Sequence, residues 1–579
     1  MIRSRLSVTK TTPLATRGLV AAEHPAGADI GAAILERGGN AVDAAVATAF
    51  AMPVVEPFMS TIAGAGTMLI HVAKRGETVC LDFNPNAPMA AHASIYKLIG
   101  GIATYALFAW PRVEDDANVY GYRSVAVPGS VAGLALALER YGTMSLKDVV
   151  APAVKLAREG FIADWYQALS TAKYLEELSA FPETARIHLR NGRSVYRPPS
   201  MEPGDRVTNP DLAASMELIG REGPDAFYRG AIAQAIHNDM AANGGWLTKD
   251  DLAAYQVRVV EPLRGRYRDL DLAFSPGATG GTTALEILNI LEQFAPSACG
   301  YTTAAGLHVR AEAVRRAFAD RFAHIGDPAV VGDAFRSLTT KEHARSVARD
   351  VKRGGAEGAA PRGVRPTSAG SARTGGRTPR GAAPSAPSDS TTRASDCTTH
   401  ISVVDKNRNM VSLTHTAVSL WGARVVVPGT GILLNNGMIW FDPEPGKPNS
   451  IAPGKRGMVN MVPVLGFKKG KPYLALGAPG GRKIIAAIPQ VIANLVDAKG
   501  SLQAAIDAPR LHHEGNGLEI DDRVGEKVMQ ALAQRGHTVA RKTETYASLN
   551  FARPVGVRIT AKGLEAGLDS FGAAAAAGH

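Results

Sequence analysis

The chain has 579 residues, of which 45% are hydrophobic and 20% charged, enough apolar side chains for a large core in one domain or in two closely packed ones. No run approaches the roughly 18 apolar residues of a membrane span, and the basic N-terminus lacks the apolar stretch of a secretory signal. The three cysteines, Cys80, Cys299 and Cys397, are too scattered for a disulfide framework or a clustered metal site. We therefore expect a cytoplasmic protein in a reducing compartment, with no membrane partner.

The formal net charge of +11 invites a nucleic-acid interpretation. Eight basic and two acidic residues lie between positions 352 and 393, so more than half of the excess belongs to one segment. The remaining charge is close to balanced and has no basic stripe interleaved with aromatic residues, the pattern that stacks bases. The charge therefore argues against a nucleic-acid partner. A non-catalytic protein that binds polyanions through this basic segment is the alternative from a different functional class.

The first hundred residues alternate short strands with alanine-rich helices. An apolar strand over 18–25 stops at Pro25, and Gly38-Gly39 ends the first of two helices. Glycines loosen the segment 54–70 before a strand, and a further strand ends at Phe83, where two prolines force an irregular loop. The two helices predicted from periodicity are 28–37 and 41–52.

The middle of the chain is largely helical. Residues 125–141 predict a strand, a turn and a helix that begins with Ser130 as its cap. Strands that alternate with long helices indicate layered α/β packing. The other helices predicted here are 146–160, 210–219, 225–242, 283–294 and 311–323.

Composition divides the chain into a long first region (1–352), a linker (353–397) and a second region (398–579); a cut at the end of the linker would make the two outer regions a large and a small subunit. The linker is almost entirely Gly, Ala, Pro, Ser, Thr and Arg, and so few apolar side chains cannot offset the entropy of ordering, so we expect it to be disordered. The second half is expected to pack its own sheet onto the sheet of the first. Its predicted strands are 401–404, 410–415, 431–434 and 473–476, and its predicted helices are 484–496 and 502–508.

Two threonines, Thr398 and Thr399, stand where the linker gives way to ordinary globular sequence. A threonine at such a junction suggests a chain that cuts itself there and uses the freed residue as its nucleophile. The segment from Thr398 to Asp405 resembles the start of the small subunit of the gamma-glutamyltransferase family, also called gamma-glutamyl transpeptidases or glutathione hydrolases. Any one of these motifs alone would be weak evidence for the family, but many motifs in the same order as in the family are specific evidence. The others are Glu23-His24-Pro25, Gly38-Gly39-Asn40-Ala41-Val42-Asp43-Ala44-Ala45, Val125 with Pro128-Gly129, Val131-Ala132-Gly133, Ala311-Glu312-Ala313, Ala319-Asp320-Arg321, Gly326-Asp327-Pro328, Leu433-Leu434-Asn435-Asn436, Lys455-Arg456 and Gly477-Ala478-Pro479-Gly480-Gly481.

The resemblance implies an α+β fold, the αββα sandwich of N-terminal-nucleophile hydrolases, built from two subunits cut from one chain. It implies a zymogen that cleaves itself between Cys397 and Thr398, after which the large and small subunits stay associated. It also implies a hydrolase or acyltransferase of the glutathione hydrolase type, which acts on gamma-glutamyl amides or related small amide and peptide substrates. The family needs no cofactor and no metal.

The resemblance gives Thr398 the role of nucleophile. A threonine hydroxyl needs a base within hydrogen-bond reach, and a free α-amine, which titrates near about 7.7, is suited to that task at neutral pH. In the uncut chain this nitrogen is an amide, so the precursor is expected to be inactive. Thr416 matches the second threonine of the family, which bonds the nucleophile; the alternative is an ordinary strand residue. Gly480 and Gly481 match the pair whose N–H groups form the oxyanion hole, although a glycine pair alone is usually only a turn.

The positions that hold the amino-acid end of the donor in the family differ here. A carboxylate loses a bidentate guanidinium partner and an ammonium loses its carboxylate, so recognition of a gamma-glutamyl head group is in question. A more apolar pocket points to an acylase with a non-glutamyl acyl donor, resembling the cephalosporin acylases of the family. The candidate substrate-binding residues are Asn84 in place of an arginine, Val418 in place of an asparagine, Trp440 near a lost aspartate, and Val459 and Asn460 in place of a serine pair.

Four further features of the sequence bear on the site. Arg482 or Lys483 either replaces the lost positive charge or is a solvated surface residue. His512-His513 beside Glu514 has no third ligand at metal spacing, so no metal site is predicted. His400 is expected to be a structural hydrogen-bonding residue rather than the base. The connection 442–456 is shorter than in relatives whose pocket has a lid, so we expect an open cleft and hydrolysis rather than transpeptidation.

Overall fold

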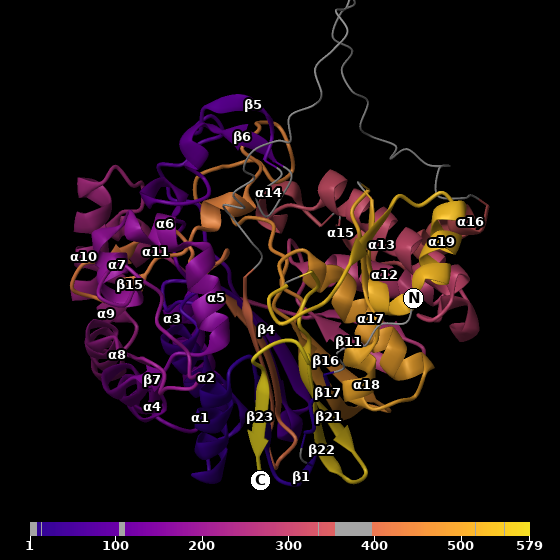
Figure 1. Cartoon of the computed structure of the whole chain (residues 1–579), viewed down its shortest axis with the longest axis horizontal. Coiled ribbons are helices and arrows are strands. Elements are labelled where there is room, and N and C mark those ends of the chain that lie inside the picture. Colours follow the sequence, from indigo (N-terminus) through magenta and orange to yellow (C-terminus); the bar gives the residue numbers. More distant parts are fainter. Residues whose placement is uncertain are drawn as a thin grey trace, which may run out of the picture.

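Two seven-stranded antiparallel sheets lie face to face between two layers of helices (Figure 1). The computed structural model describes residues 8–12, 14–103, 110–333, 335–353, 397–515, 517–548 and 550–579. The first sheet is, in spatial order, β1 (Leu14–Ala15), β22 (Gly563–Leu568), β21 (Val555–Thr560), β17 (Lys471–Gly477), β16 (Val464–Lys468), β11 (Leu270–Phe274) and β10 (Leu263–Tyr267). The second is β23 (Ala575–Gly578), β2 (Leu19–Ala22), β12 (Thr399–Val404), β13 (Met410–Thr416), β3 (Ala65–Val72), β4 (Glu77–Phe83) and β9 (Arg258–Val260).

The two-residue period of the strands builds the core in three layers. Ile401 and Val403 of β12 face the helices, while Val404 faces the other sheet. The helices over the second sheet are α1 (Pro25–Glu36), α2 (Ala41–Val55), α3 (Ser130–Tyr141), α4 (Leu146–Glu159) and α8 (Pro210–Glu222). Those on the side of the first sheet are α12 (Gly280–Leu291), α13 (Ala304–His324), α16 (Lys341–Arg353), α17 (Lys483–Asp497) and α18 (Leu502–Asp507). The αββα sandwich predicted for the chain is thereby confirmed.

Each sheet contains strands from both sides of Thr398, which corrects the expectation that each half forms its own sheet. In the second sheet, β12 is hydrogen-bonded between β2 and β13, and β13 pairs with β3. In the first, β16 pairs with β11. The sequence pattern identified the strands but not their partners, because strand pairing is non-local. A cut before Thr398 therefore leaves the two pieces joined by whole strand ladders.

Two local predictions were wrong, and one strand was not predicted. Residues 125–129 form no strand, and Ser130 is the first residue of α3 rather than its cap; its hydroxyl instead bonds His415 Nε2 at 2.8 Å. The helix predicted over 225–242 is two helices, α9 (Asp225–Tyr228) and α10 (Ala231–Ala242), because Gly230 interrupts it. The alanine-rich C-terminal tail forms β23, which pairs with β2 at the edge of the second sheet.

The predicted linker falls almost entirely outside the described residues. The helix α16 runs to Arg353, and the structure resumes at Cys397, which is 1% exposed and packed in the interior. The disorder predicted for 354–396 therefore stays a prediction. No helix within the described ranges is long and apolar enough to cross a membrane.

Candidate active site

Thr398 stands immediately before β12, at the end of a fully buried strand in the centre of the second sheet. Its side chain is 4% exposed. Its Oγ1 lies 3.3 Å from Thr416 Oγ1 and also contacts the carbonyl oxygen of Cys397. The hydroxyl thus lies beside the peptide group that joins Cys397 to Thr398.

Cys397 is held by a segment more than 300 positions away. Its thiol donates to the carbonyl oxygens of Met59, at 2.9 Å, and Phe58, at 3.3 Å. The same side chain packs in an apolar cluster with Phe58, Tyr166 and Trp421. These contacts fix the residue before the proposed cut, so its carbonyl faces the Thr398 hydroxyl in a defined orientation.

Thr416 ends β13, the strand paired with β12, and the antiparallel register brings it next to Thr398. Its Oγ1 accepts a hydrogen bond from the Val418 N–H at 2.8 Å. Thr416 Oγ1 thus accepts both from this N–H and from the Thr398 hydroxyl. Val418 has a φ of 89°, a strained conformation for a β-branched residue, and such strain is concentrated at functional sites.

Gly480 and Gly481 lie in the turn between β17 and α17. Both have positive φ, 129° and 55°, and neither backbone N–H has a partner among the residues that the structure describes. His400, two residues after Thr398, packs directly on Gly477, three residues before Gly480, so the nucleophile strand and the glycine turn approach each other across the two sheets. Two adjacent amides at the start of a helix are suited to bind a developing oxyanion.

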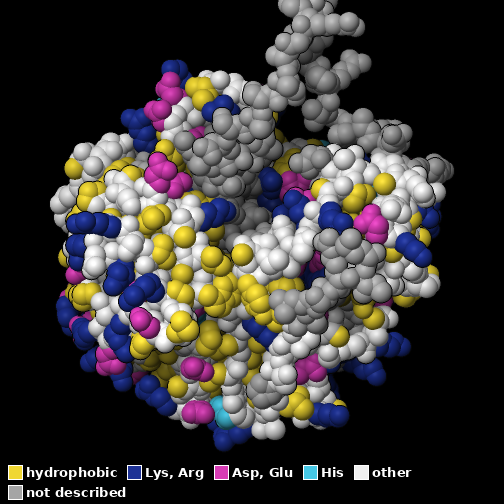
Figure 2. All heavy atoms as spheres, in the orientation of Figure 1, with side chains coloured by type: hydrophobic (Ala, Val, Ile, Leu, Met, Phe, Trp, Pro, Cys, Tyr) yellow, Lys and Arg dark blue, Asp and Glu magenta, His cyan; other side chains and the backbone are white. Residues whose placement is uncertain are grey.

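The surface is hollowed between the two helical halves, and hydrophobic side chains gather beneath the hollow (Figure 2). A cavity of about 340 Å³ is lined by residues of both halves, among them Asn84, Ala278, Arg456 and Val459. Val459 also belongs to the apolar cluster that contains Val418. A continuous set of contacts therefore leads from Thr398 through Thr416 and Val418 to this cavity.

Comparison with known proteins decides which family these features belong to. The family model described as Gamma-glutamyltranspeptidase matches residues 27–579. The Acylase ACY 1 proenzyme of Pseudomonas sp. (strain SE83) is 37% identical over 548 residues, 92% of this chain and 89% of the relative. The glutathione hydrolase proenzyme of Escherichia coli (strain K12) is 34% identical over 543 residues, 91% of this chain and 87% of the relative. The chain belongs to the gamma-glutamyltranspeptidase family.

Family membership confirms the resemblance read from the motifs, and with it an enzyme of the hydrolase and acyltransferase type. The crystal structure of cephalosporin acylase from Bacillus halodurans aligns with 100% of this chain and 98% of its own length, with a TM-score of 0.83 and 26% identity. Both sequence relatives are named proenzymes, which agrees with a precursor that is cut into associated subunits.

Three of the positions at which this family member departs from the typical pattern lie in one apolar cluster. Val418, Trp440 and Val459 are each 3% exposed or less and pack together with Ile439 and Met458. The sequence could not show that they meet, because they come from three separate loops. The cluster supports the predicted apolar character of the acyl pocket, since an uncompensated ammonium or carboxylate would be costly among these side chains.

The two polar candidates bond to the protein itself. Asn84 Nδ2 donates to Asp82 Oδ1 at 2.7 Å and to Thr67 Oγ1 at 3.1 Å, while its Oδ1 is buried without a partner in the described structure. Asn460 Oδ1 accepts from Arg321 Nη2 at 3.4 Å. Asn84 therefore still offers one acceptor beside the cavity, whereas Asn460 is tied to the helix layer.

The charged and histidine candidates have structural partners. Arg482 Nε is 2.8 Å from Glu514, and Lys483 Nζ is 2.9 Å from Glu519, so neither side chain is a simple solvated cation. His400 bonds Thr414 at 2.9 Å and Ser402 at 3.1 Å, and burial lowers its pKa to about 3. This arrangement is that of a neutral structural histidine.

Glu56 is a buried acid beside the nucleophile strand that motif reasoning did not identify. It caps the C-terminus of α2, is 1% exposed, and its Oε2 lies 3.4 Å from Thr399 Oγ1. Burial, with a smaller contribution from Asp164, raises the pKa of Glu56 to about 8. Burial also raises the pKa of nearby Glu23. The sequence indicates this buried acid only slightly, because it shows a single glutamate after an apolar helix.

Replacing Glu56 with glutamine should change how stability depends on pH. The folded-state pKa of about 8 lies above the ordinary value of 4.5, so the folded state binds more protons and wild-type stability falls as pH rises between these values, by up to about 1.4 kcal/mol per pH unit. Glutamine does not titrate. Thermal unfolding at pH 5 and pH 8 should therefore show Glu56→Gln gaining on the wild type as pH rises. Glu139→Gln, at an exposed helical position, is the matched control, and equal shifts for both variants would contradict the assignment.

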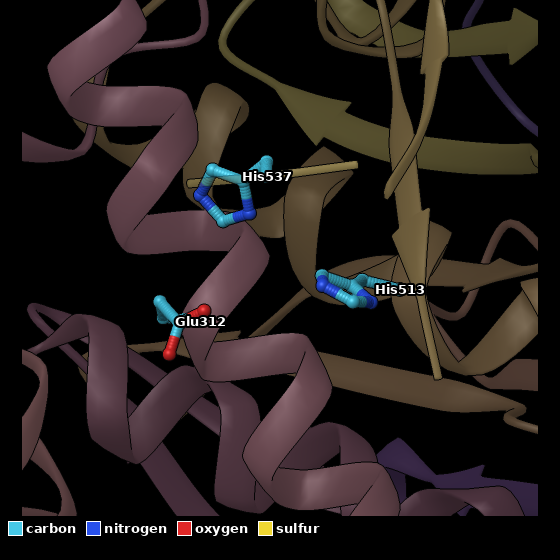
Figure 3. A group of neighbouring side chains, drawn as sticks. All are labelled: Glu312, His513 and His537. Carbon is cyan, nitrogen blue, oxygen red and sulfur yellow. The ribbon is translucent and has the colours of Figure 1, made fainter. Parts of the chain in front are cut away.

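The fold brings together two groups of possible metal ligands that are far apart in the sequence. His513 has no third ligand nearby in the sequence, but the fold brings it to Glu312 of α13 and to His537 (Figure 3). One ligand atom from each lies within 4.8 Å of the others. A second group of the same kind is Glu286, Asp320 and His343. Sequence spacing missed both groups because each draws its members from three separate elements.

Proposed function

We propose that the chain is a precursor that cuts itself between Cys397 and Thr398 and then hydrolyses amides through an acyl-enzyme on Thr398. The observation that carries this is the Thr398 hydroxyl, which lies against both Thr416 Oγ1 and the carbonyl group of Cys397. Self-cleavage starts when this oxygen attacks the Cys397 carbonyl carbon. The C–N bond then breaks, the nitrogen takes a proton, and water hydrolyses the resulting ester.

The mature site follows from the same atoms. The freed α-amine of Thr398 accepts the proton of its own hydroxyl as the oxygen attacks the substrate carbonyl. The Gly480 and Gly481 amides, which have no other partner in the described structure, donate to the oxyanion. The leaving amine takes the proton, and water then releases the acid from Thr398. Thr416 keeps the nucleophile oriented in both reactions.

We further propose that the acyl donor carries no α-amino acid head group, as in an acylase. The support is the cluster of Val418, Trp440 and Val459 at the positions where the family pattern places polar clamps. Asn84 offers one acceptor instead of a guanidinium. The relatives named acylase and cephalosporin acylase agree with this choice, and the glutathione hydrolase relative names the competing donor.

Two measurements on the purified wild type test these proposals separately. A denaturing gel with N-terminal sequencing should show two chains, 1–397 and 398–579, the second beginning at Thr398. Hydrolysis of a glutaryl anilide should then exceed that of the matching gamma-glutamyl anilide in kcat/KM. A cut enzyme that prefers the gamma-glutamyl anilide would overturn the acylase assignment and leave the self-cleavage intact.

Replacing Val418 with asparagine should move the preference toward gamma-glutamyl donors. Asparagine tolerates positive φ better than valine does, so the φ of 89° should make this change neutral or stabilising. It also returns an amide to the apolar cluster that contains Val459, a residue lining the cavity. We expect the ratio of gamma-glutamyl to glutaryl kcat/KM to rise roughly tenfold, because one added hydrogen bond of about 1.4 kcal/mol corresponds to a tenfold change in that ratio. Val418→Ala, which adds no polar group, should leave the ratio near that of the wild type; an equal change in both variants would contradict this role.

Two other expectations stay predictions. A cytoplasmic location rests on the cysteines, and Cys80, Cys299 and Cys397 are all unbridged and buried; cell fractionation tests it. Polyanion binding by the basic segment involves 354–396, which lie outside the described residues. Salt-dependent binding to heparin, with and without that segment, tests it.

A further inference from the structure

Three helices bring Glu286, Asp320 and His343 to one point. Glu286 lies on α12, Asp320 on α13 and His343 on α16. His343 Nε2 is 3.0 Å from Glu286 Oε1 and 3.1 Å from Asp320 Oδ2. One ligand atom from each residue lies within 4.8 Å of the others, so all three can reach one small divalent cation, whose bonds are about 2.0–2.2 Å.

The group contains one buried carboxylate oxygen that no hydrogen bond satisfies. Glu286 is 0% exposed, and its second oxygen, Oε2, is buried with no partner in the described part of the chain. The Asp320 carboxylate lies next to it. Two charged carboxylates side by side in a buried site repel each other, and a divalent cation between them would offset that repulsion. One imidazole supplies at most a single positive charge.

The group drawn in Figure 3 offers a useful contrast. Its carboxylate, Glu312, is already bound by Arg315 at 2.8 Å and approached by Arg316 at 3.5 Å. His513 Nδ1 accepts a hydrogen bond from the Gly515 N–H at 3.2 Å, which places the proton of the neutral ring on the other nitrogen. That group has its negative charge compensated by arginines, so it does not attract a divalent cation as Glu286 and Asp320 do.

We propose that Glu286, Asp320 and His343 bind a divalent transition-metal cation such as Zn²⁺. One oxygen from each carboxylate and Nε2 of the imidazole are ligands that suit zinc, and two carboxylates balance its charge. The side chains of Asp320 and His343 are 28% and 26% exposed, so a cation enters from solvent and water completes its coordination.

The cation would fasten α16 to α12 and α13. The helix α16 is the last element described before the proposed cut. Two of its lysines also hold it to this layer: Lys341 bonds Asn289 of α12 and Glu292, the residue after α12, and Lys352 donates to the carbonyl oxygen of Gln293. None of Thr398, Thr416, Gly480 and Gly481 lies on these helices. The site is therefore a structural one, which holds the end of the large chain in place, and it does not depend on the acyl donor proposed above.

Zinc binding by the full-length protein tests the site. Protein treated with EDTA, dialysed and titrated with ZnCl₂ at pH 8 should bind about one zinc per chain by calorimetry and elemental analysis. Its unfolding temperature should rise by a few degrees, because a ligand that binds the folded state stabilises it. CaCl₂ at the same concentration should give no shift, since calcium prefers six or more oxygen ligands. Failure of the wild type to bind zinc would overturn the proposal.

Variants then locate the bound cation. His343→Gln and Glu286→Gln should each abolish both the stoichiometric binding and the thermal shift, whereas His513→Gln, in the contrasting group, should keep both. Zinc binding that persists in His343→Gln, or that disappears in His513→Gln, would place the cation elsewhere and refute the assignment. Should the buried Glu286→Gln variant fail to fold, His343→Gln, at a partly exposed position, still decides the outcome.

Discussion

Thr398→Ala should accumulate as one uncut chain of 579 residues with no measurable amidase activity. The Thr398 hydroxyl is the group placed against the Cys397 carbonyl, and alanine removes it while keeping the backbone. Without the hydroxyl no ester forms, the bond between 397 and 398 stays intact, and no α-amine is released to act as the base. Loss of a nucleophile with its base typically costs roughly 10⁶-fold in rate. A denaturing gel and intact mass measure the first effect, and anilide hydrolysis the second.

Thr399→Ala is the matched control for this variant. Thr399 is the adjacent threonine, is equally buried, and contacts Glu56 rather than the scissile carbonyl. We expect it to be cut and active, with a modest loss of stability. If Thr398→Ala were cut at the same position, or if Thr399→Ala were the variant that stays whole, the nucleophile would be wrongly assigned.

The sandwich was predictable from sequence because the family resemblance implies it, and the separate elements were predictable because their signals are local. The apolar run that became β12 and the glycine turn before α17 each signal their own structure within a few residues. Strand pairing is different, since the partners of β12 are β2, far upstream, and β13. The strand β23 was missed for a related reason. Its sequence is alanine and glycine, which have low intrinsic strand propensity, and it is ordered by pairing with β2.

The site shows the same division. Thr398 and Thr416 could be named from motifs, but the contacts that orient them come from elsewhere. The Cys397 thiol is held by Phe58 and Met59, and nothing near Cys397 in the sequence indicates this. The two His-containing carboxylate groups also escaped, because each assembles side chains from three elements. A site residue that lies in a recognisable motif can be predicted from the sequence. A site formed by residues that are far apart in the sequence can be found only when the fold is known.

The mixed sheets give a physical account of how the enzyme survives its own cleavage. After a cut before Thr398, β12 remains bonded on one side to β2 of the large chain and on the other to β13, which itself pairs with β3. The ladder hydrogen bonds and the apolar layers on both sides of the sheet are unchanged. Cleavage therefore alters the chain terminus at the nucleophile and little else, so it can switch on catalysis without a large conformational change.

The second large effect is expected from Gly480→Ala. The Gly480 backbone has a φ of 129°, which side chains with a Cβ rarely adopt. A Cβ at this position would also lie 2.5 Å from Ala552 Cα, so the turn has to move. The N–H groups of Gly480 and Gly481 would move with it, away from the position that the oxyanion occupies.

We expect kcat of Gly480→Ala to fall roughly 10²–10³-fold with a smaller change in KM, the cost of losing one oxyanion donor. Self-cleavage should slow as well if the same amides stabilise the Cys397 oxyanion, which a time course on a denaturing gel measures.

Gly470→Ala is the control that separates the effect of backbone strain from the loss of the oxyanion donor. Gly470 also has a positive φ, of 72°, but lies in the β16–β17 hairpin with open space where a Cβ would stand. It should lose about 1 kcal/mol of stability and keep its activity. Equal kcat in Gly480→Ala and the wild type would show that the glycine turn does not bind the oxyanion, since a displaced amide cannot leave the rate unchanged.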